Sequence, residues 1–116
     1  MTRRHRLRGA AAFAAVLRRG QRLDGARLQL VALASDGGAG RVGYVVGARL
    51  LSRAVDRNRL KRMLREAIRV RRPALEAFDL VVRLRKPCAR KDLRDALAEA
   101  SELLDALALR APERRR

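Results

Sequence analysis

Cysteine, histidine and aromatic residues are scarce in this 116-residue chain, and each shortage argues against a class of function. Cys88 is the only cysteine, so neither an internal disulfide nor a cysteine-rich metal site can form. His5 is the only histidine and lies close to the N-terminus, which argues against a Ser-His-Asp triad or a histidine zinc site. Phe13, Tyr44 and Phe78 are the only aromatic residues, too few for the aromatic sheet surface of common single-strand RNA binders.

Acidic residues and long apolar runs are also lacking. The chain has 12 acidic residues against 29 basic ones, which gives a net charge of +17. No apolar run approaches the roughly 20 residues that span a membrane, and the N-terminal segment lacks the features of a signal peptide. We therefore expect a cytoplasmic protein that does not enter a membrane and whose partner is a polyanion, with nucleic acid favoured over a membrane surface.

The few carboxylates do not form a recognisable catalytic or metal-binding group. Asp56, Glu66 and Asp79 stand apart in the sequence and resemble a helix cap, a salt-bridge partner and a strand-edge residue. A protein nuclease that uses two metal ions needs clustered carboxylates. We therefore expect no catalytic residue and no metal ligand in this chain.

The length fits a single domain over residues 1–116, with frayed ends expected at 1–6 and 111–116. Helix-favouring residues between Gly9 and Gly20 predict a first helix that ends at the second glycine. A last helix is predicted from about residue 91, with one apolar side formed by Leu93, Leu97, Ala100, Leu104 and Leu107.

The β-rich segments lie between these helices. Residues 26–34 and 41–47 predict two strands, and the turn composition of residues 35–40 suggests that they form a hairpin. Residues 21–25 fit a short strand or a loop, and residues 79–87 predict a further strand. The expected fold is a two-layer α+β domain, with one sheet face either exposed or covered by helices.

The segment AVDRNRLKRMLREAIRVRR, residues 54–72, combines a high density of cations with a helical pattern. The predicted helix starts within residues 52–56, with either Ser52 or Asp56 as its cap, and it ends near residues 70–72 because Pro73 follows. Its apolar stripe consists of Leu60, Met63, Leu64, Ala67 and Ile68.

The polar positions of this helix are nearly all cationic. Arg57, Lys61 and Arg65 recur every four residues, so they form one column with steps of about 6 Å. Asn58 and Arg62 begin the adjacent column, which Arg69 extends. Like charges at this spacing cost a few tenths of a kcal/mol per pair, which binding to a phosphate backbone would offset. A solvated basic surface and a helix for a DNA groove remain alternatives, but no dimerisation segment or helix-turn-helix supports the latter, so RNA is favoured.

The stretch RNRLKRMLREAIR resembles the signature of the bacterial ribonuclease P protein component. Arg57, Asn58, Arg59, Lys61 and Arg62 match the motif, and the following Arg-Glu pair matches its continuation. The stretches RLRGAAAFAAVLRRGQR, RVGYVVGARLLSRAVD and FDLVVRLRKP are similar to other parts of the same family, so the likeness covers roughly residues 4–108.

The resemblance implies a mixed four-stranded sheet in the element order αβββαβα, with an uncommon left-handed βαβ crossover. It implies an RNA-binding set made of Arg49, Arg53, Arg57, Asn58, Arg59, Lys61, Arg62, Arg65 and Arg69. It also implies a cleft between the sheet and the first helix for a single-stranded 5′ leader, lined by Phe13, Leu17, Tyr44 and Val46. Phe13 also fits a plain core position. Two residues depart from the family pattern: Leu17 replaces a second aromatic, and Ala48 replaces one of two adjacent cations.

The implied activity is that of an accessory subunit of an endoribonuclease. In the family, the RNA subunit hydrolyses precursor tRNA with bound Mg²⁺, and the protein helps to hold the precursor. The expected partners are therefore ribonuclease P RNA and the 5′ leader of precursor tRNA, with a monomeric free protein and one protein per RNA subunit. The alternative that charge and fold class leave open is a structural RNA-binding protein, such as a ribosomal or assembly factor.

Overall fold

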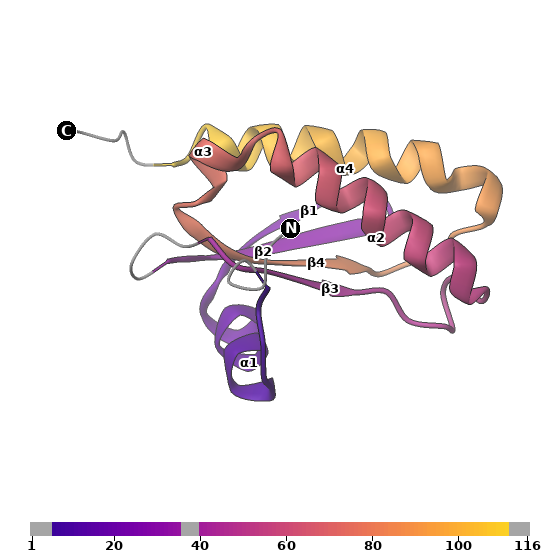
Figure 1. Ribbon diagram of the computed structural model, residues 1–116, viewed down its shortest axis with the longest axis horizontal. Helices are drawn as coiled ribbons and strands as arrows, with labels where there is room; N and C mark the ends of the chain where they lie inside the picture. Colours follow the sequence, from indigo (N-terminus) through magenta and orange to yellow (C-terminus); the bar gives the residue numbers. More distant parts are fainter. Residues whose placement is uncertain (1–5, 36–39, 112–116) are drawn as a thin grey trace.

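The structure, a computed structural model, describes residues 6–35 and 40–111 (Figure 1). Within these described residues, four helices, four strands and one short 3-10 turn follow each other. They are α1 (Ala10–Arg19), β1 (Gln21–Asp24), β2 (Leu28–Ala34), β3 (Val42–Val45), α2 (Ala54–Arg69), α3 (Arg72–Leu75), β4 (Phe78–Leu84), η3 (Arg90–Asp92) and α4 (Leu93–Ala108). The predicted α+β order is confirmed, with the single-turn helix α3 added around Pro73.

The four strands form one mixed sheet in the order β1-β2-β4-β3. β1 pairs with β2 and β2 with β4 in antiparallel fashion, whereas β3 and β4 are parallel. The expected hairpin between residues 26–34 and 41–47 is wrong, because β4 inserts between these two strands. β4 is an almost entirely buried strand, and the centre of a sheet buries such a strand on both faces. The hairpin is instead β1–β2, so residues 21–25 contribute a strand.

The parallel pair β3 and β4 is connected through α2. Both strands run in the same direction, and α2 returns across one face of the sheet (Figure 1). With β3 in front of β4 and α2 above them, the crossover is left-handed, as the family resemblance implies. This rare connection places the basic helix over the β3 edge of the sheet.

Helices cover both faces of the sheet, but to different extents. α2 and α4 lie on one face and α1 on the other (Figure 1). Because successive side chains of β2 and β4 point to opposite faces of the sheet, the core consists of two clusters, one on each face. Leu30, Leu80 and Val82 pack with α2 and α4 in the large cluster, while Val31 and Val81 pack beneath α1 in the small one.

The helix boundaries differ from the predictions in detail. The N-cap of α2 is Arg53, and no side chain caps it. Asp56, one of the two predicted caps, is instead buried and lies 3.6 Å from Arg90. Glu66 pairs with Arg69 as expected. On α4, Ala96 joins the predicted apolar side, while Leu97 is only partly buried.

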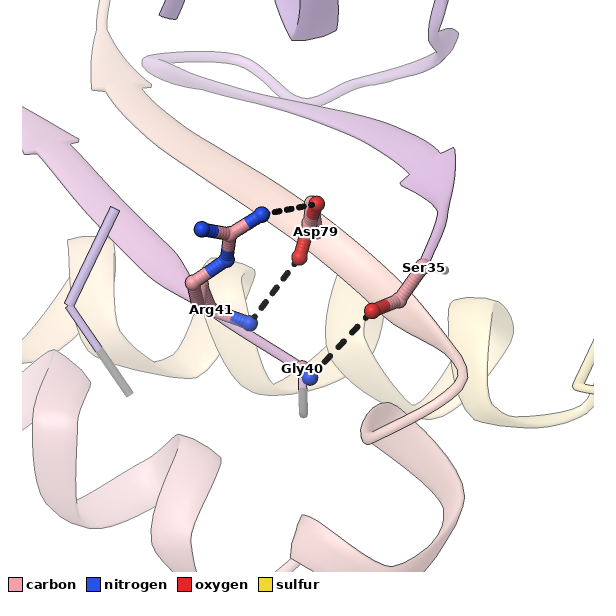
Figure 2. Close-up of polar contacts among 4 residues, drawn as sticks. All are labelled: Ser35, Gly40, Arg41 and Asp79. Carbon is pink, nitrogen blue, oxygen red and sulfur yellow. Dashed lines mark hydrogen bonds and ion pairs between the residues drawn. The ribbon is translucent and has the colours of Figure 1, made fainter. Parts of the chain in front are cut away.

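The start of β3 is tied to β4 and to the end of β2 (Figure 2). The backbone N–H of Arg41 donates to Asp79 Oδ1 at 3.1 Å, and the Arg41 guanidinium lies 3.4 Å from Oδ2. The N–H of Gly40 donates to Ser35 Oγ at 3.5 Å. Asp79 therefore lies on β4, an interior strand, where it binds the start of β3, and not at an edge of the sheet. Within the predicted turn, residues 36–39 lie outside the described residues.

The two predicted frayed ends fall largely outside the described residues as well, at 1–5 and 112–116. Arg6 is described and forms a parallel bridge with Val42 at the outer edge of β3. In the part of the chain that the structure describes, no helix has both the length and the apolar character to cross a membrane.

Candidate nucleic-acid interface

The polar side of α2 presents the predicted cations on the surface. The column Arg57, Lys61 and Arg65 is half-buried. Lys61 and Arg65 both line a cleft at the β3 edge, so this column lies along that edge. The apolar stripe Leu60, Leu64 and Ile68 is fully buried below.

The remaining polar residues of α2 cover its outer surface. Asn58, Arg62 and Arg69 are exposed opposite the apolar stripe. Arg59 is also exposed, but it precedes Lys61 by two residues, a rotation of about 200°, and so projects from the opposite flank. The cations thus cover the whole open side of the helix, and none of them points into the core.

Within the described residues, Arg57 and Arg69 donate hydrogen bonds to other groups of the protein. Nη1 of Arg57 donates to the backbone carbonyls of Leu51 and Ser52, at 2.9 and 2.8 Å. Arg57 thereby holds the loop that precedes α2. Arg69 makes a two-point contact with Glu66, which lowers the pKa of the Glu66 carboxyl and raises the pKa of Arg69. Lys61, Arg62 and Arg65 are therefore the column and surface cations best placed for an external phosphate.

A cleft of about 400 Å³ wraps around the edge strand β3 between α1 and α2. Its lining combines apolar residues, two aromatic rings and three cations: Arg6, Leu7, Phe13, Val42, Gly43, Tyr44, Lys61 and Arg65. Cations together with aromatic rings are the combination that single-stranded nucleic acids bind through phosphates and stacked bases.

Phe13 reaches this cleft because Gly43 leaves space for its ring. A Cβ at Gly43 would lie 2.3 Å from Cζ of Phe13, so the ring rests directly on the strand backbone. On its other side Phe13 packs with the small cluster beneath α1. Phe13 is thus a cleft residue and a packing residue at once.

Tyr44 enters the cleft from the opposite sheet face. Its ring packs with the large cluster, and the Arg65 guanidinium carbon lies 5.8 Å from the ring centroid, within the range of a cation–π contact. Burial raises the pKa of Tyr44 to about 12, although Arg65 and Arg72 act in the opposite direction. Within residues 6–35 and 40–111, the buried Tyr44 hydroxyl makes no hydrogen bond.

The other predicted residues lie near the cleft but not on its lining. Leu17 packs in the small cluster beneath α1, and Val46 packs against the large cluster on the α2 side. Of the four residues predicted for the leader cleft, Phe13 and Tyr44 line the cleft at the β3 edge, and the place where a leader binds stays a prediction. Arg49 and Arg53 are exposed in the loop before α2 and at its N-cap.

Four lining residues were not among the predicted site residues: Arg6, Leu7, Val42 and Gly43. Arg6 was assigned to a frayed end, yet the neighbouring N–H of Leu7 donates to the Val42 carbonyl at 3.0 Å and holds the segment against β3. Gly43 carried a usable signal, because a glycine inside a β-branched run marks a close approach to the strand backbone. Nothing in the local sequence indicated that Arg6 would reach β3.

The described residues offer no obvious site for a metal ion held by the protein alone. Across residues 6–35 and 40–111, no three His, Cys, Asp or Glu side chains come together as a possible ligand group.

Known proteins share both the sequence and the fold of this chain. The Ribonuclease P family model matches residues 1–108. The ribonuclease P protein component of Nitrosomonas europaea is 36% identical over 105 residues, covering 90% of this chain and 88% of that protein. The one from Salmonella paratyphi A is 37% identical over 103 residues, covering 89% and 86%.

Solved structures agree with this result. The RNase P protein from Thermotoga maritima superposes with a TM-score of 0.70 at 26% identity, covering 93% of this chain and 98% of that one. The Staphylococcus aureus RNase P protein, at 22% identity, shares the fold with a TM-score of 0.70 over 92% and 94% of the two chains. The chain belongs to the bacterial ribonuclease P protein component family.

Proposed function

We propose that this protein is the protein subunit of ribonuclease P, and that it assists a catalytic RNA in removing the 5′ leader from precursor tRNA. The basic side of α2 binds the RNA subunit, and the cleft at the β3 edge binds the single-stranded leader. The protein works in the cytoplasm, as a monomer when free and as one copy per RNA subunit. Family membership and the geometry of the cleft support this proposal.

One observation carries the proposal furthest. Lys61 and Arg65 project from the basic helix into the same cleft as Phe13 and Tyr44. A strand lying in this cleft would place phosphates against the two cations and bases against the rings. Stacking on an aromatic ring contributes about 1–3 kcal/mol per base. Leu17 lies outside the cleft, so Phe13 and Tyr44 supply the stacking surface. Because Leu17 replaces the second aromatic residue of the family on α1, one stacking contact is missing and leader binding is weaker.

The chemical step belongs to the RNA in this proposal. Bound Mg²⁺ would supply hydrolytic chemistry there, coordinated by RNA oxygens. The contribution of the protein is electrostatic and positional: cations reduce the repulsion between two RNA strands, and the cleft orients the leader relative to the cleavage site. This contribution is largest at low Mg²⁺, where few metal ions screen the phosphates.

The test is reconstitution with a bacterial ribonuclease P RNA. At low Mg²⁺ the wild-type chain should accelerate cleavage of precursor tRNA well above the RNA alone. Lys61→Gln/Arg65→Gln should lose most of this gain, whereas Lys91→Gln/Arg94→Gln, with the same charge loss at exposed positions of η3 and α4, should retain it.

Two outcomes would contradict the proposal. Cleavage no faster with the wild-type chain than with RNA alone would reject the subunit assignment. Equal losses in both double variants would reject the cleft as the leader site. Purification of the chain from cells with ribosomal subunits, and not with one small stable RNA, would favour a ribosomal or assembly protein instead.

A further inference from the structure

Three buried side-chain atoms lack a hydrogen bond in the part of the chain that the structure describes, and they belong to two side chains that lie near each other. They are the hydroxyl of Tyr44 and the Nη1 and Nη2 atoms of Arg72. Leaving a buried donor unpaired is costly, so such groups in a folded protein call for an explanation. The RNA contacts proposed so far make no use of Arg72.

Arg72 lies on the side of α2 and α3 that faces the β3 edge. It follows Arg65 by seven residues, about two helical turns, and only two residues separate α2 from α3. The guanidinium carbon of Arg65 lies 5.8 Å from the centroid of the Tyr44 ring. Burial raises the pKa of Tyr44, and the charges of Arg65 and Arg72 both lower it, so both cations lie near this ring. Arg72 thus continues the column of Lys61 and Arg65.

Unlike the two column residues that line the cleft, Arg72 turns its guanidinium into the protein. Its two Nη atoms are fully covered, although the residue as a whole is half-buried. Gly40, just before β3, lies against the guanidinium: a Cβ at this position would lie 2.5 Å from Nη1. Burial lowers the pKa of Arg72, while Glu76 and Tyr44 act in the opposite direction. The cation is therefore buried just below the surface, and within residues 6–35 and 40–111 neither Nη group donates a hydrogen bond.

We propose that Arg72 is a reserve cation for RNA, which leaves its buried position when RNA binds and donates to a phosphate beside Lys61 and Arg65. Little is lost when the side chain turns outward, because its Nη groups are unpaired in the buried position. Against a phosphate they gain charge-assisted hydrogen bonds, which are the stronger kind. RNA binds the outward position better and so shifts the population toward it. The choice of RNA as the polyanion rests on the proposed function.

The alternative is a purely structural arginine, and the preceding residue shows what that looks like. Nε of Arg71 donates to Asp105 Oδ1 at 2.7 Å, and its Nη1 donates to the backbone carbonyl of Ala67 at 2.7 Å. Arg71 thereby ties the end of α2 to α4. It carries the same charge as Arg72 at the adjacent position but is already paired, which makes it the matched control.

The first experiment compares the thermal stability of Arg72→Met and Arg71→Met in the absence of RNA. Both variants lose one positive charge, so any general relief of repulsion is the same. Arg72→Met should raise the Tm of the full chain, because it removes two unpaired buried donors. Arg71→Met should lower the Tm, because the hydrogen bonds to Asp105 and Ala67 are lost.

The second experiment measures how RNA binding by the same variants depends on salt. Fluorescence anisotropy of a labelled oligouridylate, titrated with the full chain at several KCl concentrations, gives the slope of log affinity against log salt. Arg72→Met should reduce the magnitude of this slope by about 0.7, the contribution of one single-strand phosphate contact. Arg71→Met should leave the slope unchanged. A variant that is more stable and yet has lost a phosphate contact is not expected from a structural role.

The third experiment follows the departure of Arg72 from Tyr44. Tyr44 is the only tyrosine and the chain has no tryptophan, so intrinsic fluorescence reports the surroundings of this one ring. Linear polyphosphate is the probe, because it carries phosphates but no bases that could stack in the cleft. At low salt it should change the fluorescence of the wild type and of Arg71→Met alike. Arg72→Met should lose most of this change and keep only the part due to Arg65.

The proposal is overturned if Arg72→Met keeps the wild-type slope, if it lowers the Tm as Arg71→Met does, or if it keeps the full fluorescence change. These outcomes are separate from those of the reconstitution. A wild-type chain that fails to stimulate cleavage rejects the subunit assignment and leaves the melts and slopes intact. An unchanged slope for Arg72→Met together with successful stimulation by the wild type rejects the reserve cation alone.

Discussion

Replacing Gly43 with alanine should destabilise the fold because of one neighbour, the ring of Phe13. The new Cβ would lie 2.3 Å from Cζ and 2.7 Å from Cε1 of that ring. Carbon atoms in contact are normally 3.5–4.0 Å apart, so the ring must move away from the strand. Overpacking of this kind costs about 1–3 kcal/mol.

In a variant that lacks the Phe13 ring, Gly43→Ala should raise the free energy of unfolding instead of lowering it. Phe13 is half-buried, so Phe13→Ala alone should cost about 2 kcal/mol, less than for a fully buried phenylalanine. Gly43 does not have a positive φ, so alanine fits its backbone. In the Phe13→Ala background, Gly43→Ala should therefore stabilise the strand by about 0.5–1 kcal/mol. The coupling between the two sites should be about 2 kcal/mol or more.

Urea unfolding of the wild type, the two single variants and the double variant, followed by circular dichroism, measures this coupling. Gly47→Ala is the control, because a Cβ there meets nothing within 4 Å and should change the free energy of unfolding little. If the losses in free energy of unfolding of the two single variants add up to that of the double variant within about 0.5 kcal/mol, the reasoning is refuted, because Phe13 then does not rest on Gly43.

Three further predictions concern α2 and its neighbours. Leu64→Ala should lower the free energy of unfolding by about 2–5 kcal/mol, as measured by urea unfolding, because Leu64 is fully buried; a loss below 1 kcal/mol would contradict this packing. Arg57→Gln should lower the thermal midpoint, because the carbonyls of Leu51 and Ser52 lose their donor, at a cost of about 1 kcal/mol; an unchanged midpoint would show that the loop does not need it. The pKa of Tyr44 is about 12 in the folded state against 10.0 in the unfolded chain. The stabilisation that results from this difference is fully present below pH 10, and the free energy of unfolding falls by about 1.4 kcal/mol per pH unit as pH rises from 10 to about 12. Tyr44→Phe should remove this part of the decline at alkaline pH and leave the free energy of unfolding at neutral pH unchanged. If plots of the free energy of unfolding against pH stay parallel for the wild type and Tyr44→Phe above pH 10, the prediction is rejected.

The helices could be predicted well because their signals are local. The apolar stripe of α2 recurs with the helical period, so Leu60, Leu64 and Ile68 point to one side in any fold that buries them. The excess of Arg on the other side, together with the family motif around Asn58, pointed to RNA. Both inferences use residues within one or two turns of each other.

The candidate site was predicted only in part. Phe13 and Tyr44 line one cleft, but Leu17 and Val46 do not. That Arg57 also holds the loop before α2 was not predicted. The positions of Arg6 and Arg72 escaped the sequence, because their neighbours are distant in the chain. No periodicity records which strand lies beside another.

The sequence by itself determined that the chain forms amphipathic helices and apolar strands, and that its surface attracts polyanions, because period, propensity and net charge are properties of neighbouring residues or of the whole composition. Only the tertiary structure decided that β4 separates β2 from β3, that α2 lies beside the β3 edge, and that Phe13 rests on Gly43. β2 and β4 are the two interior strands and are largely buried, but which strands lie beside them depends on long-range pairings that no local pattern encodes.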